Sequence, residues 1–244
     1  MIVIPMMGAS SRFFDAGYDR PKFMLPLAGR LVFDWVLKSF SAYFSSELFV
    51  FVVRRDFDVK KFVQQRAESL GIARSAVLEL EGSTRGQADT VAIALDCVSS
   101  SELDGLLTIF NADTFLPDFS LPTIDDGVGG VLDVFLGLGD HWSFVKAGTN
   151  SNVECTSEKV RISDLCSNGL YVFRDSHIFL SAFRDMVGDS ATSFGEYYVA
   201  PVYNYVIDSG VRVEYRLVGD DDSIFCGTPA EYECLVASKW AGFV

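Results

Sequence analysis

The chain has 244 residues, of which 49% are hydrophobic and 14% aromatic, so it can bury a large core and is neither disordered nor low in complexity. Its formal net charge of −13 argues against affinity for nucleic acid or an anionic membrane, which needs clustered Lys and Arg, and neither is expected as a partner. No long stretch rich in Pro, Gly or Ser interrupts the chain, which predicts a single domain over 1–244.

Cysteine content and hydropathy indicate the compartment. The N-terminus lacks a signal peptide, no apolar run reaches transmembrane length, and no cysteine pair has metal-site spacing. We therefore expect a soluble, cytoplasmic protein whose cysteines are free thiols. These are Cys97, Cys155, Cys166, Cys226 and Cys234.

Strand-like runs alternate with helix-length segments, which is typical of a Rossmann-like α/β fold: a mixed but mostly parallel sheet with helices on both faces. Strands are predicted near 1–5, 48–54, 76–80, 106–111, 129–138, 143–147, 169–173 and 211–217, and helices near 31–44, 58–70, 87–98, 177–187, 196–209 and 229–240. Residues 148–157 are predicted to form a loop. Four strand-and-helix units fill the first half, so ligands are expected at the carboxyl ends of their strands.

The segment from Gly8 to Lys22 follows the first predicted strand. A turn of small residues lets backbone N–H groups approach an anion, and Arg12 and Lys22 add positive charge beside it. This combination indicates a phosphate-binding loop, although a strand-to-helix turn with solvated basic residues would have a similar pattern. It is not a Walker loop, because no Gly-Lys-Ser/Thr sequence follows.

Two further motifs follow later strands. Gly86 permits close approach at the start of a helix, and the amide of Gln87 is suited to pair with the edge of a base. Asn111 and Asp113 follow the strand near 106–111, where a carboxylate is suited to a hard divalent cation. A helix cap near Ser83 and a turn cap at Asp113 are the structural alternatives.

The second half offers fewer signals. Lys159 is a candidate clamp for the phosphate of a second substrate, or a solvated surface lysine. Thr228 and Pro229 are explained structurally, as the N-cap and first residue of the last helix. His141 and His177 have no nucleophile signature near them, so triad hydrolysis is not expected.

Taken in order, these motifs resemble the sugar-1-phosphate nucleotidylyltransferases of the compact bacterial type. The resemblance covers nearly the whole chain and implies an NTP substrate, Mg²⁺ and release of pyrophosphate. It implies an NTP-binding half over about 1–140 and an acceptor-binding half over about 141–244. By the same resemblance, the catalytic residues are Arg12 and Lys22; the nucleotide-binding residues are Gly8, Ala9, Ser10, Ser11, Gly86, Gln87 and Asn111; the acceptor-binding residues are Lys159, Asn168, Gly169 and Glu196; and a metal ligand is Asp113.

One position departs from the family pattern. The second metal-binding aspartate usually lies three residues before the threonine of Gly-Thr-Pro, where this chain has Phe225. The acidic run Asp220, Asp221 and Asp222 precedes it closely. We hypothesise that one of these carboxylates, with Asp222 the first choice, takes the metal role; a solvated turn is the equal alternative.

The activity expected from this resemblance is Mg²⁺-dependent transfer of a nucleotidyl group from an NTP to a small phosphorylated acceptor. Short segments, 10–18 and 110–115, are similar to enzymes of capsule decoration, a subgroup that includes cytidylyltransferases acting on compounds such as phosphoglutamine. A glycosyltransferase of the same fold and a non-catalytic nucleotide-binding protein remain alternatives. The sequence leaves open the base (CTP, UTP, dTTP, GTP or ATP), the acceptor and the oligomeric state, a homodimer included.

Overall fold

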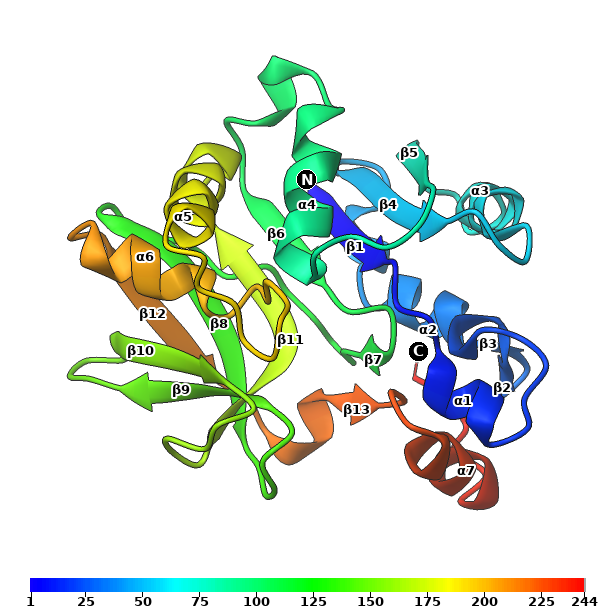
Figure 1. The fold of residues 1–244 in the computed structure, drawn as a ribbon. Helices are drawn as coiled ribbons and strands as arrows, with labels where there is room; N and C mark the ends of the chain where they lie inside the picture. The colour runs from blue at the N-terminus through cyan, green and yellow to red at the C-terminus, as the bar shows by residue number, and fades with distance from the viewer. Residues whose placement is uncertain (244) are drawn as a thin grey trace.

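The N-terminal half is a parallel sheet in the order β5–β4–β1–β6, seen in the computed structural model, which describes residues 1–243 apart from the side chain of Asp220 (Figure 1). Because β4 contributes the unbroken apolar run 49–53, it is buried on both faces, as a central parallel strand requires. The strands are β1 (Ile2–Met6), β4 (Leu48–Arg54), β5 (Arg74–Leu80) and β6 (Leu107–Phe110), connected through α2 (Val32–Lys38), α3 (Val59–Ser69) and α4 (Gln87–Asp96).

The C-terminal half continues the same sheet through antiparallel pairing of β11 with β6. β11 also pairs with β8 and β9, β9 with β10, and β8 runs parallel to β12. These elements are β8 (Val128–Leu136), β9 (Ser143–Ala147), β10 (Val153–Glu158), β11 (Leu165–Phe173), β12 (Arg212–Leu217), α5 (Ser176–Gly188) and α6 (Val202–Asp208). The two halves are therefore one continuous sheet.

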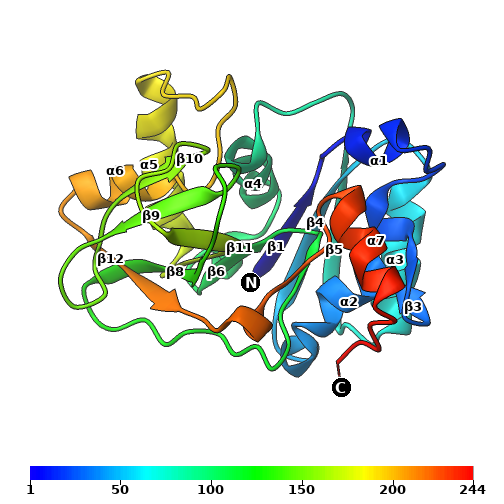
Figure 2. The same cartoon turned by 90° about the horizontal axis from the view of Figure 1, so that it is seen from below.

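Helices cover both faces of this sheet (Figures 1 and 2). Side chains alternate along β1, so Ile2 and Ile4 join a core with α2 and α3, whereas Val3 joins a second core with α4, α5 and α6. Figure 2 shows α2 and α3 on the opposite side of the sheet from α5 and α6. The predicted fold class is confirmed.

Small elements close the molecule around the carboxyl ends of the parallel strands. The two-residue strand β7 (Thr114–Phe115) pairs with β13 (Ile224–Phe225), which brings the end of the chain back beside β6. α7 (Pro229–Ala237) then packs near α1 (Ser11–Asp15), where Tyr232 contacts the ring of Phe13. The hairpin of β2 (Pro26–Leu27) and β3 (Arg30–Leu31) lies beside α7, and the carbonyl of Pro26 accepts a hydrogen bond from the Tyr232 hydroxyl.

Every predicted strand and helix has a counterpart, but three segments differ. The helix predicted over 31–44 ends at Lys38, and a short 3-10 helix over Ser41–Tyr43 follows it. Residues 148–157 are not wholly a loop, because β10 begins at Val153 and pairs antiparallel with β9. The helix predicted over 196–209 begins only at Val202, since the backbone of Tyr197 instead forms hydrogen bonds with Arg85 and Ala88. Within the described residues, no helix is both long and apolar enough to cross a membrane.

Candidate active site

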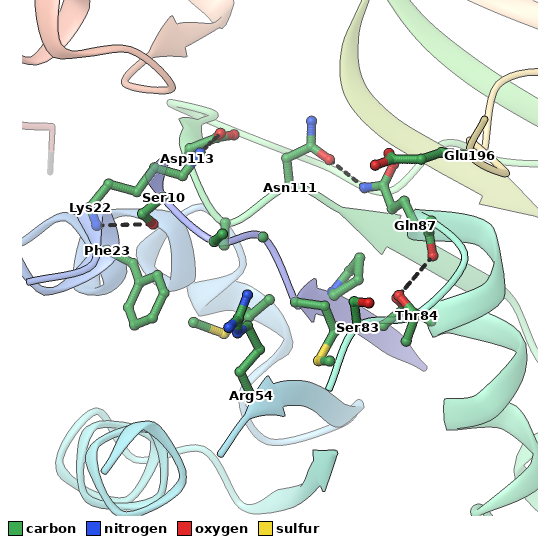
Figure 3. Close-up of a pocket in the computed structure, with 18 of the residues that line it drawn as sticks. Ser10, Lys22, Phe23, Arg54, Ser83, Thr84, Gln87, Asn111, Asp113 and Glu196 are labelled. Carbon is green, nitrogen blue, oxygen red and sulfur yellow. Dashed lines mark hydrogen bonds and ion pairs between the residues drawn. The ribbon is translucent and has the colours of Figure 1, made fainter. Parts of the chain in front are cut away.

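Two adjoining cavities lie at the carboxyl ends of the parallel strands. The first, of about 480 Å³, is lined by segments that follow β1, β5 and β6 and by the last residue of β4 (Figure 3). The second, of about 450 Å³, lies toward β9, β10 and β11. Gln87, Asn111, Asp113 and Tyr198 line both, so the cavities form one continuous cleft.

The loop after β1 forms one wall of the first cavity. Gly8 and Ala9 are exposed there, and Ser10 adopts a left-handed conformation with φ of 52° as it begins α1. The Ser10 hydroxyl accepts a hydrogen bond from the backbone N–H of Lys22 at 3.4 Å (Figure 3). The predicted loop residues and the predicted lysine are thus held together.

Lys22 and Asp113 form an ion pair where the two cavities meet (Figure 3). The side chains are 20% and 21% exposed, so both remain open to the cleft. The backbone carbonyl of Asp113 accepts the N–H of Cys226 at 2.8 Å, which fixes the segment after β6 against β13. Burial raises the pKa of the Cys226 thiol to about 12, so this neighbour stays protonated at neutral pH.

Gln87 donates a hydrogen bond to the side-chain oxygen of Asn111 at 2.6 Å (Figure 3). Asn111 also explains a glycine: a Cβ at Gly169, whose φ is +91°, would lie 2.2 Å from the Asn111 amide nitrogen. β11 therefore passes close enough to Asn111 that only glycine fits there.

The second cavity combines a buried acid with a lysine. Glu158 is only 6% exposed and accepts a hydrogen bond from Ser143; burial raises its pKa, against the opposing effects of that bond and of Lys159. Lys159 donates to the Tyr198 hydroxyl at 2.6 Å and lies 4.4 Å from that ring's centroid. Lys159 and Tyr198 therefore line the second cavity together, and the acceptor-clamp role of Lys159 stays a prediction.

The remaining predicted residues line the first cavity, the second cavity or neither. Arg12 is exposed and lines the second cavity, whereas Glu196, predicted at the acceptor, lines the first. The buried Asn168 lines the second cavity, but its amide nitrogen donates to Ser223 at 2.9 Å. Ser11 is among the lining residues of neither cavity.

The described side chains of the acidic run before β13 do not line the cleft. Asp222 is exposed, and its carboxylate accepts the backbone N–H of Gly219 at 2.7 Å within its own turn. Asp222 is not among the lining residues of either cavity, and the side chain of Asp220 lies outside the described part of the chain.

Several cleft residues were not predicted. Arg54 ends β4 and lines the first cavity; its place after a parallel strand is a signal that could have identified it. Trp142 and Phe225 form an aromatic wall of the second cavity, with ring centroids 4.8 Å apart. Glu231 lines the same cavity, although its spacing from Thr228 indicates only a capping box.

The cleft fits a divalent cation in donor chemistry. Among residues 1–243 no group of three His, Cys, Asp or Glu side chains could hold a metal ion. Mg²⁺, however, is commonly held by one or two carboxylates together with substrate phosphates and water. Asp113 offers such a carboxylate at the open junction of the two cavities.

Comparison with solved structures identifies close similarity to one of them. The chain is 44% identical to a nucleoside-diphosphate-sugar pyrophosphorylase from Vibrio cholerae RC9, over 97% of this chain and 100% of that one, with a TM-score of 0.92. An inositol-1-phosphate CTP transferase from T. maritima shares 17% identity over 100% of this chain and 97% of its own, with a TM-score of 0.72. A UDP-glucose pyrophosphorylase in complex with UDP-glucose shares 11%, over 97% of each chain, with a TM-score of 0.71. The last two show the fold alone. No protein-family model and no curated protein matches the sequence.

Proposed function

Because the chain belongs to the family of nucleoside-diphosphate-sugar pyrophosphorylases, we propose that it transfers a nucleotidyl group from an NTP to a phosphorylated acceptor. An acceptor phosphate oxygen attacks the α-phosphorus, a new P–O bond forms, and the bond to the bridging oxygen breaks. Pyrophosphate leaves with that electron pair. The product is a nucleoside diphosphate joined to the acceptor.

The observation that carries this proposal is the Lys22–Asp113 pair at the junction of the two cavities. Two anionic substrates must meet at the reacting phosphorus, and charge neutralisation is then the main work of the protein. Lys22, a cation that lines the first cavity beside Asp113 at the junction, meets that requirement. Lys159 adds positive charge on the acceptor side and Arg54 on the nucleotide side, while Arg12, which follows the phosphate-binding loop, lines the second cavity.

We assign the roles along the cleft accordingly. Backbone groups of 8–11 would bind the triphosphate, while Lys22 and Arg12 would stabilise the charge that develops on pyrophosphate. Gln87 and Asn111 would contact the nucleoside, and Lys159 would hold the acceptor phosphate. The division into an NTP-binding half over about 1–140 and an acceptor-binding half over about 141–244 is part of this proposal.

Mg²⁺ is the proposed cofactor, with Asp113 as a ligand. When bound, it would neutralise charge on phosphate oxygens of the two substrates. The resemblance of 10–18 and 110–115 to capsule-decoration enzymes supports CTP as the first donor to test and a cell-surface polysaccharide precursor as the product.

The test is pyrophosphate release by the full chain with Mg²⁺, each of CTP, UTP, dTTP, GTP and ATP, and a panel of acceptors that includes sugar 1-phosphates, inositol 1-phosphate and phosphoglutamine. We expect release only when an NTP and a matching acceptor are both present. A thermal-shift screen of the same NTPs identifies the base, because a ligand that binds the folded state raises its unfolding temperature. NTP binding without acceptor-dependent release would favour a non-catalytic protein, and turnover of a nucleotide sugar by a glycosyl transfer would favour a glycosyltransferase; either result overturns the proposal.

A further inference from the structure

Phe225 cannot supply the oxygen ligand that the family places at its position. Its ring packs against Trp142 and Phe135, with centroids 4.8 and 5.0 Å away, as part of the aromatic wall. Asp222, the nearest predicted substitute, accepts a hydrogen bond from Gly219 and is not among the lining residues described for either cavity. A second carboxylate must therefore be sought elsewhere in the cleft.

Glu231 is a carboxylate that lines the second cavity together with Asp113. It lies in the first turn of α7, where its Oε2 accepts the N–H groups of Gly227 and Thr228 at 2.8 Å each. Its Oε1 has no hydrogen-bond partner among residues 1–243. One oxygen thus fixes the side chain, and the other is left for a ligand.

Gly227 shows that the two carboxylates flank the same space. A Cβ at this glycine would lie 3.0 Å from Asp113 Oδ2 and 3.7 Å from Glu231 Oε2. Pairing of β13 with β7 and the bond from Cys226 N–H to the Asp113 carbonyl hold the two segments in this relation. The arrangement is built into the backbone and does not depend on long flexible side chains.

We propose that Glu231 supplies the second carboxylate of the cation site whose first is Asp113. This inference rests on the proposed function, from which the need for Mg²⁺ comes. Lys22 pairs with Asp113, whereas Glu231 has no ion pair among residues 1–243, so a divalent cation between the two carboxylates would be favoured. Two carboxylates leave the remaining positions to phosphates and water, as Mg²⁺ prefers.

The experiment measures binding of Mn²⁺ alone by electron paramagnetic resonance, with the full chain and single variants. Glu231→Gln removes the charge but keeps an oxygen that can cap α7, because glutamine also serves in capping boxes. Thr228→Ala removes the other half of the capping box and leaves the carboxylate. Asp222→Asn tests the competing carboxylate, and thermal unfolding is measured for every variant.

We expect Glu231→Gln to weaken Mn²⁺ binding at least about tenfold, since even groups outside the direct ligands of a metal act on that scale. Its unfolding temperature should stay near that of the unaltered chain. Asp222→Asn should bind Mn²⁺ normally, and Thr228→Ala should unfold at a lower temperature without losing Mn²⁺.

Three results would overturn the assignment. The first is normal Mn²⁺ binding by Glu231→Gln, and the second is loss of Mn²⁺ binding in Asp222→Asn instead. The third is weaker Mn²⁺ binding in both Glu231→Gln and Thr228→Ala, in proportion to the fall in their unfolding temperatures. Absence of Mn²⁺ binding in the unaltered chain would also overturn it. In that case pyrophosphate release measured with EDTA decides separately whether the proposed transfer survives without a cation.

Discussion

Lys22 and Asp113 form an ion pair in the cleft. In the proposed reaction, Lys22 would neutralise phosphate charge directly, and Asp113 would do so by holding Mg²⁺. Removing one preorganised charged group from such a site typically lowers turnover on the order of a hundred- to a thousand-fold. We expect Lys22→Ala and Asp113→Ala each to fall in that range while remaining folded, because both side chains are open to the cleft. The measurement is kcat for pyrophosphate release, with thermal unfolding to establish the folded state.

Lys61→Ala is the matched control, since Lys61 is an exposed lysine on α3. It should retain normal turnover. Near-normal kcat in either cleft variant would remove that residue from the mechanism.

The buried carboxylate of Glu158 should make the stability of the protein depend on pH. Burial raises its pKa in the folded protein above the unfolded value. In the window from about pH 4.5 up to the raised pKa, the folded state therefore binds more protons at Glu158 than the unfolded state does. The free energy of unfolding contributed by this group is therefore greatest below that window and falls as the pH rises through it. Glu158→Gln removes the ionisation and should unfold at a higher temperature than the unaltered chain near pH 7, with the difference shrinking toward about pH 4.

Thermal unfolding at several pH values measures this difference. Glu154→Gln serves as the control, because Glu154 lies on the same strand but is exposed and pairs with Lys146. A difference for Glu158→Gln that stays constant with pH would contradict the assignment of a buried, ionised carboxylate.

At the residue scale, the sequence locates much of the cleft because residues after parallel strands meet at one sheet edge. Gly8, Gln87 and Asn111 line the first cavity for this reason. The same reasoning cannot choose between Asp222 and Glu231. Both are acids near Phe225, and only the pairing of β13 with β7 determines which of them lines the same cavity as Asp113.

Among the elements, the loop before α4 and the segment before α6 are locked together. The N–H of Tyr197 donates to the Arg85 carbonyl at 2.8 Å, and the N–H of Ala88 donates to the Tyr197 carbonyl at 2.9 Å. Gly86 lies between these bonds with φ of 128° and ψ of 179°, a conformation that is essentially restricted to glycine. A Cβ there would lie 2.6 Å from Tyr197 backbone atoms.

Gly86→Ala should therefore lower the free energy of unfolding by on the order of 1–3 kcal/mol and weaken NTP binding, because it separates the two segments. Urea unfolding and NTP titration measure the two effects. Gly82→Ala is the control: Gly82 also has positive φ, at +76°, but a Cβ there would meet nothing within 4 Å. Equal effects of both substitutions on NTP binding would show that backbone strain, and not the contact with Tyr197, is responsible.

Two segments are not predicted correctly from the sequence, and the lock explains the first of them. Residues 196–201 have a helix-like apolar pattern, but the backbone N–H and carbonyl of Tyr197 bond to Arg85 and Ala88, about 110 residues earlier, which local patterns cannot reveal. In β10 the alternation of apolar and polar residues is broken, because Thr156 and Glu158 are buried. Thr156 is buried against Asn204 and Glu158 against Ser143, so polar partners replace the usual apolar face.

On the scale of the whole molecule, charge is distributed unevenly. The chain carries a formal net charge of −13, yet Arg12, Lys22, Arg54 and Lys159 all line the cleft. Four acids, Asp113, Glu158, Glu196 and Glu231, line the cleft as well, so its lining is formally neutral within a strongly negative chain. A neutral cleft repels anionic substrates less than the rest of the surface does. Composition excludes nucleic acid as an expected partner, but only the fold determines where the few cations gather.

The two halves of the single sheet should bind the two substrates separately. Lys159 extends from the end of β10 toward Tyr198 and lines only the second cavity, so its charge should act on the acceptor phosphate. A hydrogen bond to a charged group contributes about 1.5–3 kcal/mol, which corresponds to roughly ten- to a hundred-fold in affinity. Lys159→Gln should therefore raise KM for the acceptor by that factor and leave NTP binding unchanged within about twofold.

Lys146→Gln is the control, because Lys146 pairs with Glu154 on the exposed side of the same hairpin. Steady-state kinetics with the acceptor and titration with the NTP measure the two quantities, and equal loss of both would reject the division into an NTP-binding and an acceptor-binding half.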